Sequence, residues 1–211
     1  MASALFIGID LTSSPKRPTA CVGLDDKLSL IFDDLFSSDA DILESIASYR
    51  PRIVAIDAPL GLPKGLCCLE ESCSCQPLAP AKGRACEREL SRRGIPSYYT
   101  TKRSIIKNMV YRAISLKREI DARGCEVIEV YPYAAKVILF GRSIPSKWKP
   151  PGISFLRQRL AQLMPQLTAY LPRFNHDLCD ALIAAYNVYL YARGEAEAVG
   201  DWEEGAICVP L

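Results

Sequence analysis

The 211-residue chain lacks several features that define other classes of protein. It has no apolar run long enough to span a bilayer, so we expect no membrane contact. The opening residues, MASALFIGID, carry no basic leader, and Asp10 interrupts their apolar stretch, so we expect no signal peptide and a cytoplasmic location. Internal repeats and low-complexity segments are also missing. With 49% hydrophobic residues, the sequence predicts one domain over residues 1–211.

Histidine is almost absent, since His176 is the only one in the chain. A histidine at the start of a helix is usually structural, although one beside bound metals would be suited to carry protons. The chain has nine cysteines, and none has a histidine or other base partner visible in the sequence. The sequence therefore argues against catalysis by a cysteine nucleophile.

Net charge is also small, at +2, but it is unevenly distributed. Residues 1–81 hold 6 basic and 11 acidic side chains (net −5), and residues 160–211 hold 2 and 7 (net −5). Residues 82–159 hold 18 basic and 6 acidic side chains, net +12. A basic middle segment predicts a surface that faces an anion, whereas any single Lys or Arg more often belongs to a solvated helix face.

Apolar patterning and turn residues predict an α/β order. The predicted strands cover residues 4–10, 19–24, 28–33, 53–57 and 125–131. The predicted helices follow Ser38 as far as Pro51 and cover residues 85–93, 104–123, 132–140, 154–170 and 176–193. Residues 58–84 show little periodicity and many Pro, Gly and Cys, which indicates a long loop or small insertion.

Three acidic residues stand at or near strand ends: Asp10, Asp57 and Glu129. Asp177 and Asp180 are spaced i,i+3 and share one face of the last predicted helix. If these side chains converge, their repulsion requires a compensating cation. Hard oxygen ligands select Mg²⁺ or Mn²⁺, and two such ions clamp the attacking and leaving oxygens of a phosphodiester.

Each of these acids also has a simpler explanation. Asp10 would suit a turn, Glu129 would suit an ion pair with a nearby base, and Asp177 with Asp180 resembles a helix capping box. Taken singly, these explanations are at least as good as a catalytic role. Taken together, three strand-terminal acids and a D-x-x-D helix favour a site.

Two further groups are candidates for substrate binding. The turn containing Thr12, Ser13 and Lys16 would hold phosphate oxygens, unless it is an ordinary polar turn. Basic residues interleaved with Tyr98 and Tyr99 suit single-stranded nucleic acid, although two tyrosines in a turn are more often packing residues. These basic residues are Arg84, Arg88, Lys102 and Arg103.

Five cysteines cluster in or beside the predicted loop: Cys67, Cys68, Cys73, Cys75 and Cys86. Their spacing is not that of paired C-x-x-C zinc knuckles, so structural zinc stays open but is not favoured. Disulfides are an equal alternative if the source is a hyperthermophile. Either bridge would staple a loop that has no core of its own.

The motifs of this chain resemble those of the DUF429 family, which is predicted to contain nucleases with the ribonuclease H-like fold. The resembling segments, in order, are GIDLTSSPKRP (8–18), VAIDAPLGLP (54–63), R-x-C-x-R-E-L (84–90), EVIEVYP (126–132) and NHDLCDALIAA (175–185). The resemblance implies a mixed five-stranded sheet, its first three strands antiparallel, flanked by helices.

The same resemblance implies that Asp10 bridges two metal ions. Asp57 and Asp180 would complete the cluster, with Asp177 or Glu129 contributing. We therefore expect a Mg²⁺- or Mn²⁺-dependent hydrolase that acts on DNA or RNA. The alternatives are a phosphotransferase or ATPase of the actin-like superfold, and a binding module without catalysis. The first alternative needs a duplicated domain and glycine-rich phosphate hairpins, which GIDLTSSPK does not supply.

Overall fold

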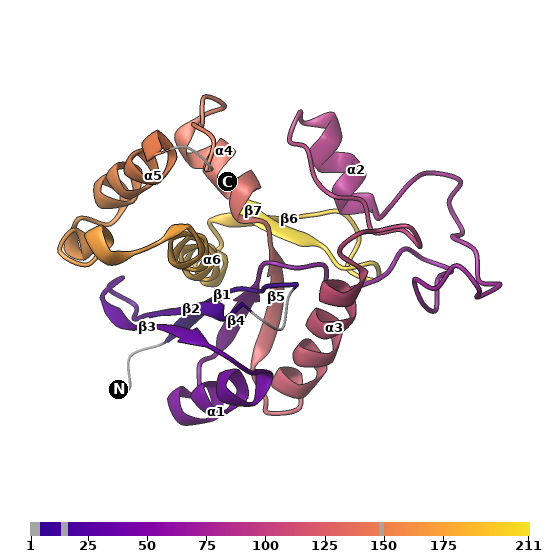
Figure 1. Ribbon diagram of the computed structural model, residues 1–211, viewed down its shortest axis with the longest axis horizontal. Coiled ribbons are helices and arrows are strands. Elements are labelled where there is room, and N and C mark those ends of the chain that lie inside the picture. Colours follow the sequence, from indigo (N-terminus) through magenta and orange to yellow (C-terminus); the bar gives the residue numbers. More distant parts are fainter. Residues whose placement is uncertain (1–4, 14–16, 148–149) are drawn as a thin grey trace.

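The computed structural model describes residues 5–13, 17–147 and 150–211 and shows one mixed sheet of seven strands (Figure 1). The strand order is β3-β2-β1-β4-β5-β7-β6. The strands are β1 (Phe6–Asp10), β2 (Thr19–Leu24), β3 (Leu30–Phe36), β4 (Ile53–Ile56), β5 (Glu126–Val130), β6 (Ala196–Val199) and β7 (Ile207–Pro210). Strands β1, β2 and β3 are antiparallel neighbours, and β4, β5 and β7 run parallel to β1.

The predicted α/β arrangement, with a mixed sheet whose first three strands are antiparallel, is confirmed, but the predicted number of five strands is too low. The two strands that were not predicted, β6 and β7, have only four residues each. Neither AEAV nor ICVP is long enough to show a period of two, and β7 ends on a proline. These strands form because β7 completes the parallel edge beside β5, where Glu129 pairs with Ile207 and Val130 with Cys208.

Six α-helices accompany the sheet in the described residues: α1 (Asp39–Tyr49), α2 (Ala85–Arg92), α3 (Lys107–Asp121), α4 (Pro132–Phe140), α5 (Pro150–Leu163) and α6 (His176–Ala192). The first helix follows Ser38, as predicted, and Ser38 and Asp41 form a reciprocal capping box at its start. No helix in the described parts of the chain is long and apolar enough to cross a membrane.

The helices cover both faces of the sheet (Figure 1). Alternate residues of β1 and β4, such as Ile9 and Ile56, belong to the core cluster that includes α1 and α3. The residues that alternate with these along each strand face α6. At Gly8, a Cβ atom would lie 2.1 Å from the Ala185 backbone nitrogen, so the backbone of α6 rests directly on β1. This close contact brings the first turns of α6 to the end of β1.

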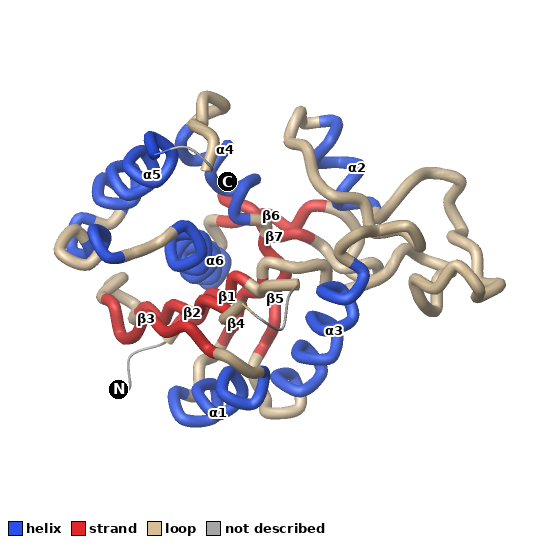
Figure 2. Tube along the Cα trace, viewed as in Figure 1, coloured by secondary structure: helices blue, strands red, loops and turns tan. Residues whose placement is uncertain are grey.

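Residues 58–84 contain neither helix nor strand and extend away from the sheet beside α2 and α3 (Figure 2). Leu69 is nevertheless fully buried in this loop, and Leu78 donates a backbone hydrogen bond to the carbonyl of Lys64 at 2.8 Å. The loop is therefore folded against the body of the protein without regular secondary structure.

Candidate active site

Asp10 and Asp57 are neighbours at the ends of two parallel strands. Ile9 of β1 is in register with Ile56 of β4, and each aspartate is the next residue of its chain. The Asp57 amide donates to the Ile9 carbonyl at 2.8 Å, so the pairing continues to the aspartates. Their backbones therefore lie about one strand spacing, or about 4.8 Å, apart.

The two aspartates point toward α6. Successive strand side chains alternate between faces, and Ile9 and Ile56 occupy the face covered by α1 and α3. Asp177 and Asp180, from the first turns of α6, join Asp10 and Asp57 in lining one cavity of about 720 Å³. The structure therefore brings together all four aspartates that the sequence singled out.

Neither Asp177 nor Asp180 caps the N-terminus of α6. Asn175 is the N-cap, and its side chain accepts a hydrogen bond from the Leu178 amide at 2.8 Å. The suggestion that Asp177 caps the helix is therefore wrong. Asp177 lies in the first turn instead, where the positive end of the helix dipole favours a carboxylate. Asp180 is one turn further along and is buried.

Lys136 is a charged residue of the cavity that the sequence analysis missed. Its Nζ donates to Asp180 Oδ1 at 2.8 Å, and both side chains are buried. The signal was present in PYAAKVILF, because a single lysine in a nearly all-apolar helix has to be buried with a partner. Lys136 fixes the orientation of Asp180 from the neighbouring helix α4.

Negative charge predominates around the cavity. Six carboxylates and four basic side chains line it, a difference of −2. Burial raises the pKa of Asp57 to about 8, assisted by the charge of Asp180 and opposed by that of Lys136. Burial also raises the pKa of Asp10 well above its usual value, as do the charges of Asp57 and Asp180. The aspartates are therefore short of compensating positive charge.

The donor atoms of this cluster fit Mg²⁺ or Mn²⁺ better than a soft metal, because they are all carboxylate oxygens. Among the described residues, no three of these oxygens lie within 4.8 Å of one another. Ligands of two ions about 4 Å apart need not all be that close. The aspartates thus form an open cluster of hard ligands whose repulsion a divalent ion would relieve.

His176 lies at the first position of α6, next to this cluster. Burial lowers the pKa of its imidazole, while the charge of Asp180 raises it and that of Lys136 lowers it. The side chain is half-buried.

Glu129 lines the same cavity as the aspartates, but its carboxylate is held in an ion pair. It is in register with Ile56, so its side chain leaves the opposite face of the sheet from Asp57. Both of its carboxylate oxygens accept from Arg84, each at 2.6 Å, and one also accepts from the Leu60 amide at 2.8 Å. The simpler explanation, an ion pair, describes Glu129 correctly.

The same contacts correct the substrate-binding role expected of Arg84. Its side chain is 1% exposed, and its Nε donates to Glu87 Oε1 at 2.9 Å. Glu87 in turn accepts from the amide and hydroxyl of Thr100, at 2.8 and 2.6 Å. The fully satisfied network joins β5, the start of α2 and the segment before α3. Arg88 is also half-buried and donates to the carbonyl of Gly83.

Hydrogen bonds from Arg112 fix the turn that follows β1. This α3 residue donates to the Thr12 carbonyl at 2.7 Å, to Asp39 at 2.6 Å and to the Thr19 hydroxyl at 3.1 Å. Thr12 and Ser13 line the aspartate cavity. Lys16 lies outside the described residues.

Lys102 and Arg103 lie at a second cavity, of about 640 Å³. Lys82, Tyr98 and Tyr99 also line it, and the Lys82 ammonium lies 4.8 Å from the centre of the Tyr99 ring. Tyr98 is 66% exposed and lines both cavities. It therefore lies between the basic residues of the second cavity and the aspartates of the first.

Comparison with known proteins identifies the class of the chain. The family model described as "Protein of unknown function (DUF429)" matches residues 8–204, so the protein belongs to the DUF429 family. The resemblance seen in its motifs is thereby confirmed. No curated protein matches the chain significantly.

Two solved structures of RuvC from Thermus thermophilus are similar in fold. The first, in complex with a Holliday junction substrate, has 12% identity and a TM-score of 0.46 over 96% of this chain and 99% of RuvC. The second has 13% identity and a TM-score of 0.45 over 90% of this chain and 96% of RuvC.

Proposed function

We propose that this protein is a phosphodiesterase that uses Mg²⁺ or Mn²⁺ to cleave nucleic acid. The observation that carries the proposal is the adjacent pair Asp10 and Asp57, facing Asp180 across one cavity. One buried and two half-buried carboxylates with insufficient positive charge are costly to hold together. That cost is explained if the cavity is built to take up a divalent cation.

Asp10, Asp57 and Asp180 would supply the oxygen ligands, and Asp177 lies beside them at the cavity wall. Bound ions would polarise a phosphoryl oxygen and neutralise the charge that develops during cleavage. Lys136 holds Asp180 toward the cavity through their ion pair. Glu129 supports the site from the other face by fixing Arg84 and the loop that follows Asp57.

Nucleic acid is the favoured substrate because the second cavity has the right chemistry beside the aspartates. Lys82, Lys102 and Arg103 provide positive charge for a phosphate backbone. Tyr98 offers an exposed ring on which a base can stack, and it stands between the two cavities. A single strand that crosses Tyr98 would bring a phosphodiester to the aspartates.

Cleavage assays with Mg²⁺ or Mn²⁺ test the proposal on labelled single- and double-stranded DNA and RNA. The unmodified protein should cleave at least one of these. Asp10→Asn should lower the rate about 100-fold or more, the scale of losing an electrostatic stabiliser of the transition state. Asp121→Asn is the matched control, because Asp121 is exposed at the end of α3 and its carboxylate pairs with Lys117.

Other outcomes would identify another function. Hydrolysis of ATP without cleavage of any nucleic acid would support the phosphotransferase alternative. Salt-sensitive binding without cleavage, unchanged in Asp10→Asn, would support a non-catalytic binding module.

A further inference from the structure

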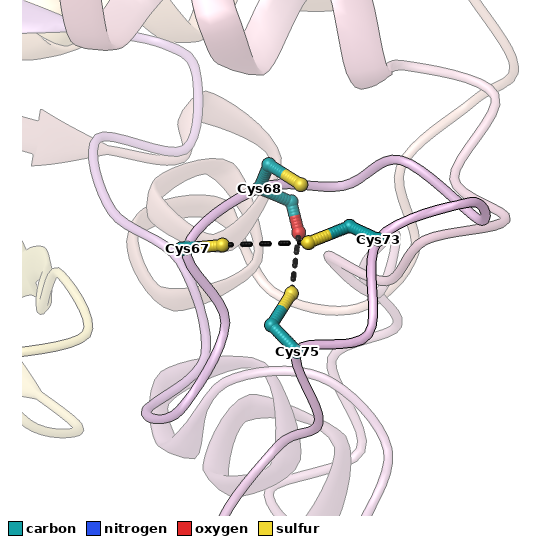
Figure 3. A group of neighbouring side chains, drawn as sticks. All are labelled: Cys67, Cys68, Cys73 and Cys75. Atoms are coloured by element: carbon teal, nitrogen blue, oxygen red, sulfur yellow. Dashed lines mark hydrogen bonds between the residues drawn. The ribbon is translucent and has the colours of Figure 1, made fainter.

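The loop 58–84 contains a second group of candidate metal ligands. These ligands are thiols, whereas those of the first group are carboxylates. Cys67, Cys68, Cys73 and Cys75 come from two short stretches of this loop, and their sulfur atoms point toward a common centre (Figure 3). All four Sγ atoms lie within 4.8 Å of one another. Cys86, which the sequence grouped with them, is a residue of α2 and is buried in the core instead.

The distances match a four-sulfur metal site. A Zn–S bond of about 2.3 Å in a tetrahedron places neighbouring sulfurs about 3.8 Å apart. Cys67 Sγ and Cys73 Sγ are 3.6 Å apart, and all four thiols are free. Four converging sulfurs without a carboxylate or histidine select a soft or borderline metal with tetrahedral geometry.

We propose that Cys67, Cys68, Cys73 and Cys75 bind one structural Zn²⁺. The four ligands would fill a tetrahedral shell, which leaves no position for a substrate or a reactive water. The spacing C-C-x₄-C-x-C departs from paired C-x-x-C knuckles, which is why the sequence did not favour zinc. A tight turn compensates for that spacing: the Cys73 amide donates to the Glu70 carbonyl at 3.2 Å and folds the second pair back onto the first.

The surroundings show what such an ion would stabilise. The Leu69 amide donates to the Tyr111 hydroxyl at 2.6 Å, and Glu70 pairs with Lys107 at 2.9 Å, so the loop is docked on α3. Lys102 donates to the Cys73 carbonyl, which places a positive charge beside the thiolates. A zinc ion with four thiolates carries a charge of −2, and this lysine offsets part of it.

The same loop forms one wall of the second cavity. Pro63, Leu66 and Pro77 face Lys102 and Arg103 across it. Zinc would therefore hold the shape of that cavity from a distance. The inference does not depend on the proposed nuclease activity, because it rests only on the sulfur atoms and their contacts with α3.

Metal analysis of the protein purified without chelators tests the proposal directly. Elemental mass spectrometry should find one zinc per chain, and a mercurial reagent that blocks thiols should release it to a colorimetric indicator. Cobalt substitution should give the intense thiolate-to-cobalt absorption of a tetrahedral sulfur site. All three measurements use the unmodified protein, so the test holds even if a variant fails to fold.

Variants assign the ion to its ligands. The double change Cys73→Ser and Cys75→Ser should remove the zinc and speed proteolytic cutting within residues 62–84. Cys125→Ala is the matched control, because Cys125 is buried at the start of β5, and it should keep full zinc content. Iron in place of zinc, a Cys67–Cys73 disulfide, or four reactive thiols in metal-free folded protein would each overturn the proposal.

Discussion

Arg84 and Glu129 form a buried, two-pronged ion pair that joins the start of α2 to strand β5, with both N–O distances at 2.6 Å. The pair also explains why the loop after Asp57 is ordered, since Glu129 accepts the Leu60 amide. Removing one partner of such a pair leaves an uncompensated buried charge. This relationship gives Glu129 a positioning role that can be separated from a metal-binding one.

We expect Glu129→Ala to lower the free energy of unfolding by about 3–5 kcal/mol. Replacing all three charges, as in Arg84→Met with Glu87→Gln and Glu129→Leu, should restore most of that loss, because Glu87 also pairs with Arg84 and no buried charge is then left unpaired. Urea unfolding measures both effects, with Glu126→Ala as the control at an exposed position of the same strand. A triple variant no more stable than Glu129→Ala would contradict the structural role.

The stability of the metal-free protein should depend on the protonation of Asp57. Its pKa in the folded state is raised to about 8 by burial and by Asp180. The folded protein then binds the proton more tightly than the unfolded chain, whose Asp titrates near pH 4. This contribution to stability is therefore complete below about pH 4 and is lost progressively up to about pH 8.

Melting temperatures between pH 5 and pH 9 in the presence of a chelator measure this effect. The melting temperature of the unmodified protein should fall over that range by more than that of Asp57→Asn. Parallel curves for the two proteins would show that Asp57 is already well compensated without a metal.

Lys136 should stabilise the metal-free protein but oppose binding of a cation. In Lys136→Met, Asp180 loses its partner, so the free energy of unfolding should fall by about 3–5 kcal/mol. The cavity also becomes more negative, so Mn²⁺ should bind more tightly. Unfolding and titration calorimetry measure the two effects.

Lys117→Met breaks a partly exposed pair with Asp121 and is the control for this experiment. It should cost no more than about 1 kcal/mol and leave Mn²⁺ binding unchanged. Weaker Mn²⁺ binding in Lys136→Met would mean that the lysine positions Asp180 more than it competes with the ion.

Nucleic-acid binding should depend on the second cavity and on salt. The double reversal Lys82→Glu with Arg103→Glu should weaken binding and reduce the slope of log affinity against log salt by about 0.7–0.9 for each lost phosphate contact. Tyr98→Ala should cost about 1–3 kcal/mol of binding free energy for a single strand. Fluorescence anisotropy at several salt concentrations measures these changes.

Lys27→Glu is the matched control for the charge reversal. Lys27 lies in the β2–β3 turn, and the register of β1 with β2 places that turn at the sheet edge opposite Asp10. Its reversal should leave the affinity nearly unchanged. A loss in Lys27→Glu about half that of the double reversal would show that binding responds to net charge alone.

The fold and the aspartate cluster could largely be predicted from the sequence. The apolar runs before Asp10 and Asp57 are continuous, and parallel strands end at one sheet edge, so their convergence follows from local pattern. The ion pair of Glu129 could not be predicted, because its face depends on register and its partner Arg84 is 45 residues away. Pairing at that separation has no signature in a local window.

Charge alone was a poor guide to exposure in the basic segment. Arg84 counts toward the excess of positive charge, yet Glu87 and Glu129 neutralise it in the interior. Similarly, the spacing of the cysteines did not indicate that four of them converge. A turn, and not a regular C-x-x-C knuckle, brings Cys73 to Cys67. In both cases, the position of the side chain depends on contacts that form only when the chain folds.

The most direct test of the central claim is a crystal structure of the protein soaked in Mn²⁺ with a non-cleavable nucleic-acid strand, measured for anomalous scattering. The proposed function predicts a manganese peak about 2.1 Å from carboxylate oxygens of both Asp10 and Asp57. It also predicts that the peak disappears in Asp10→Asn and persists in Asp121→Asn. A cavity without manganese at saturating concentration, with Lys136 still paired to Asp180, would contradict it.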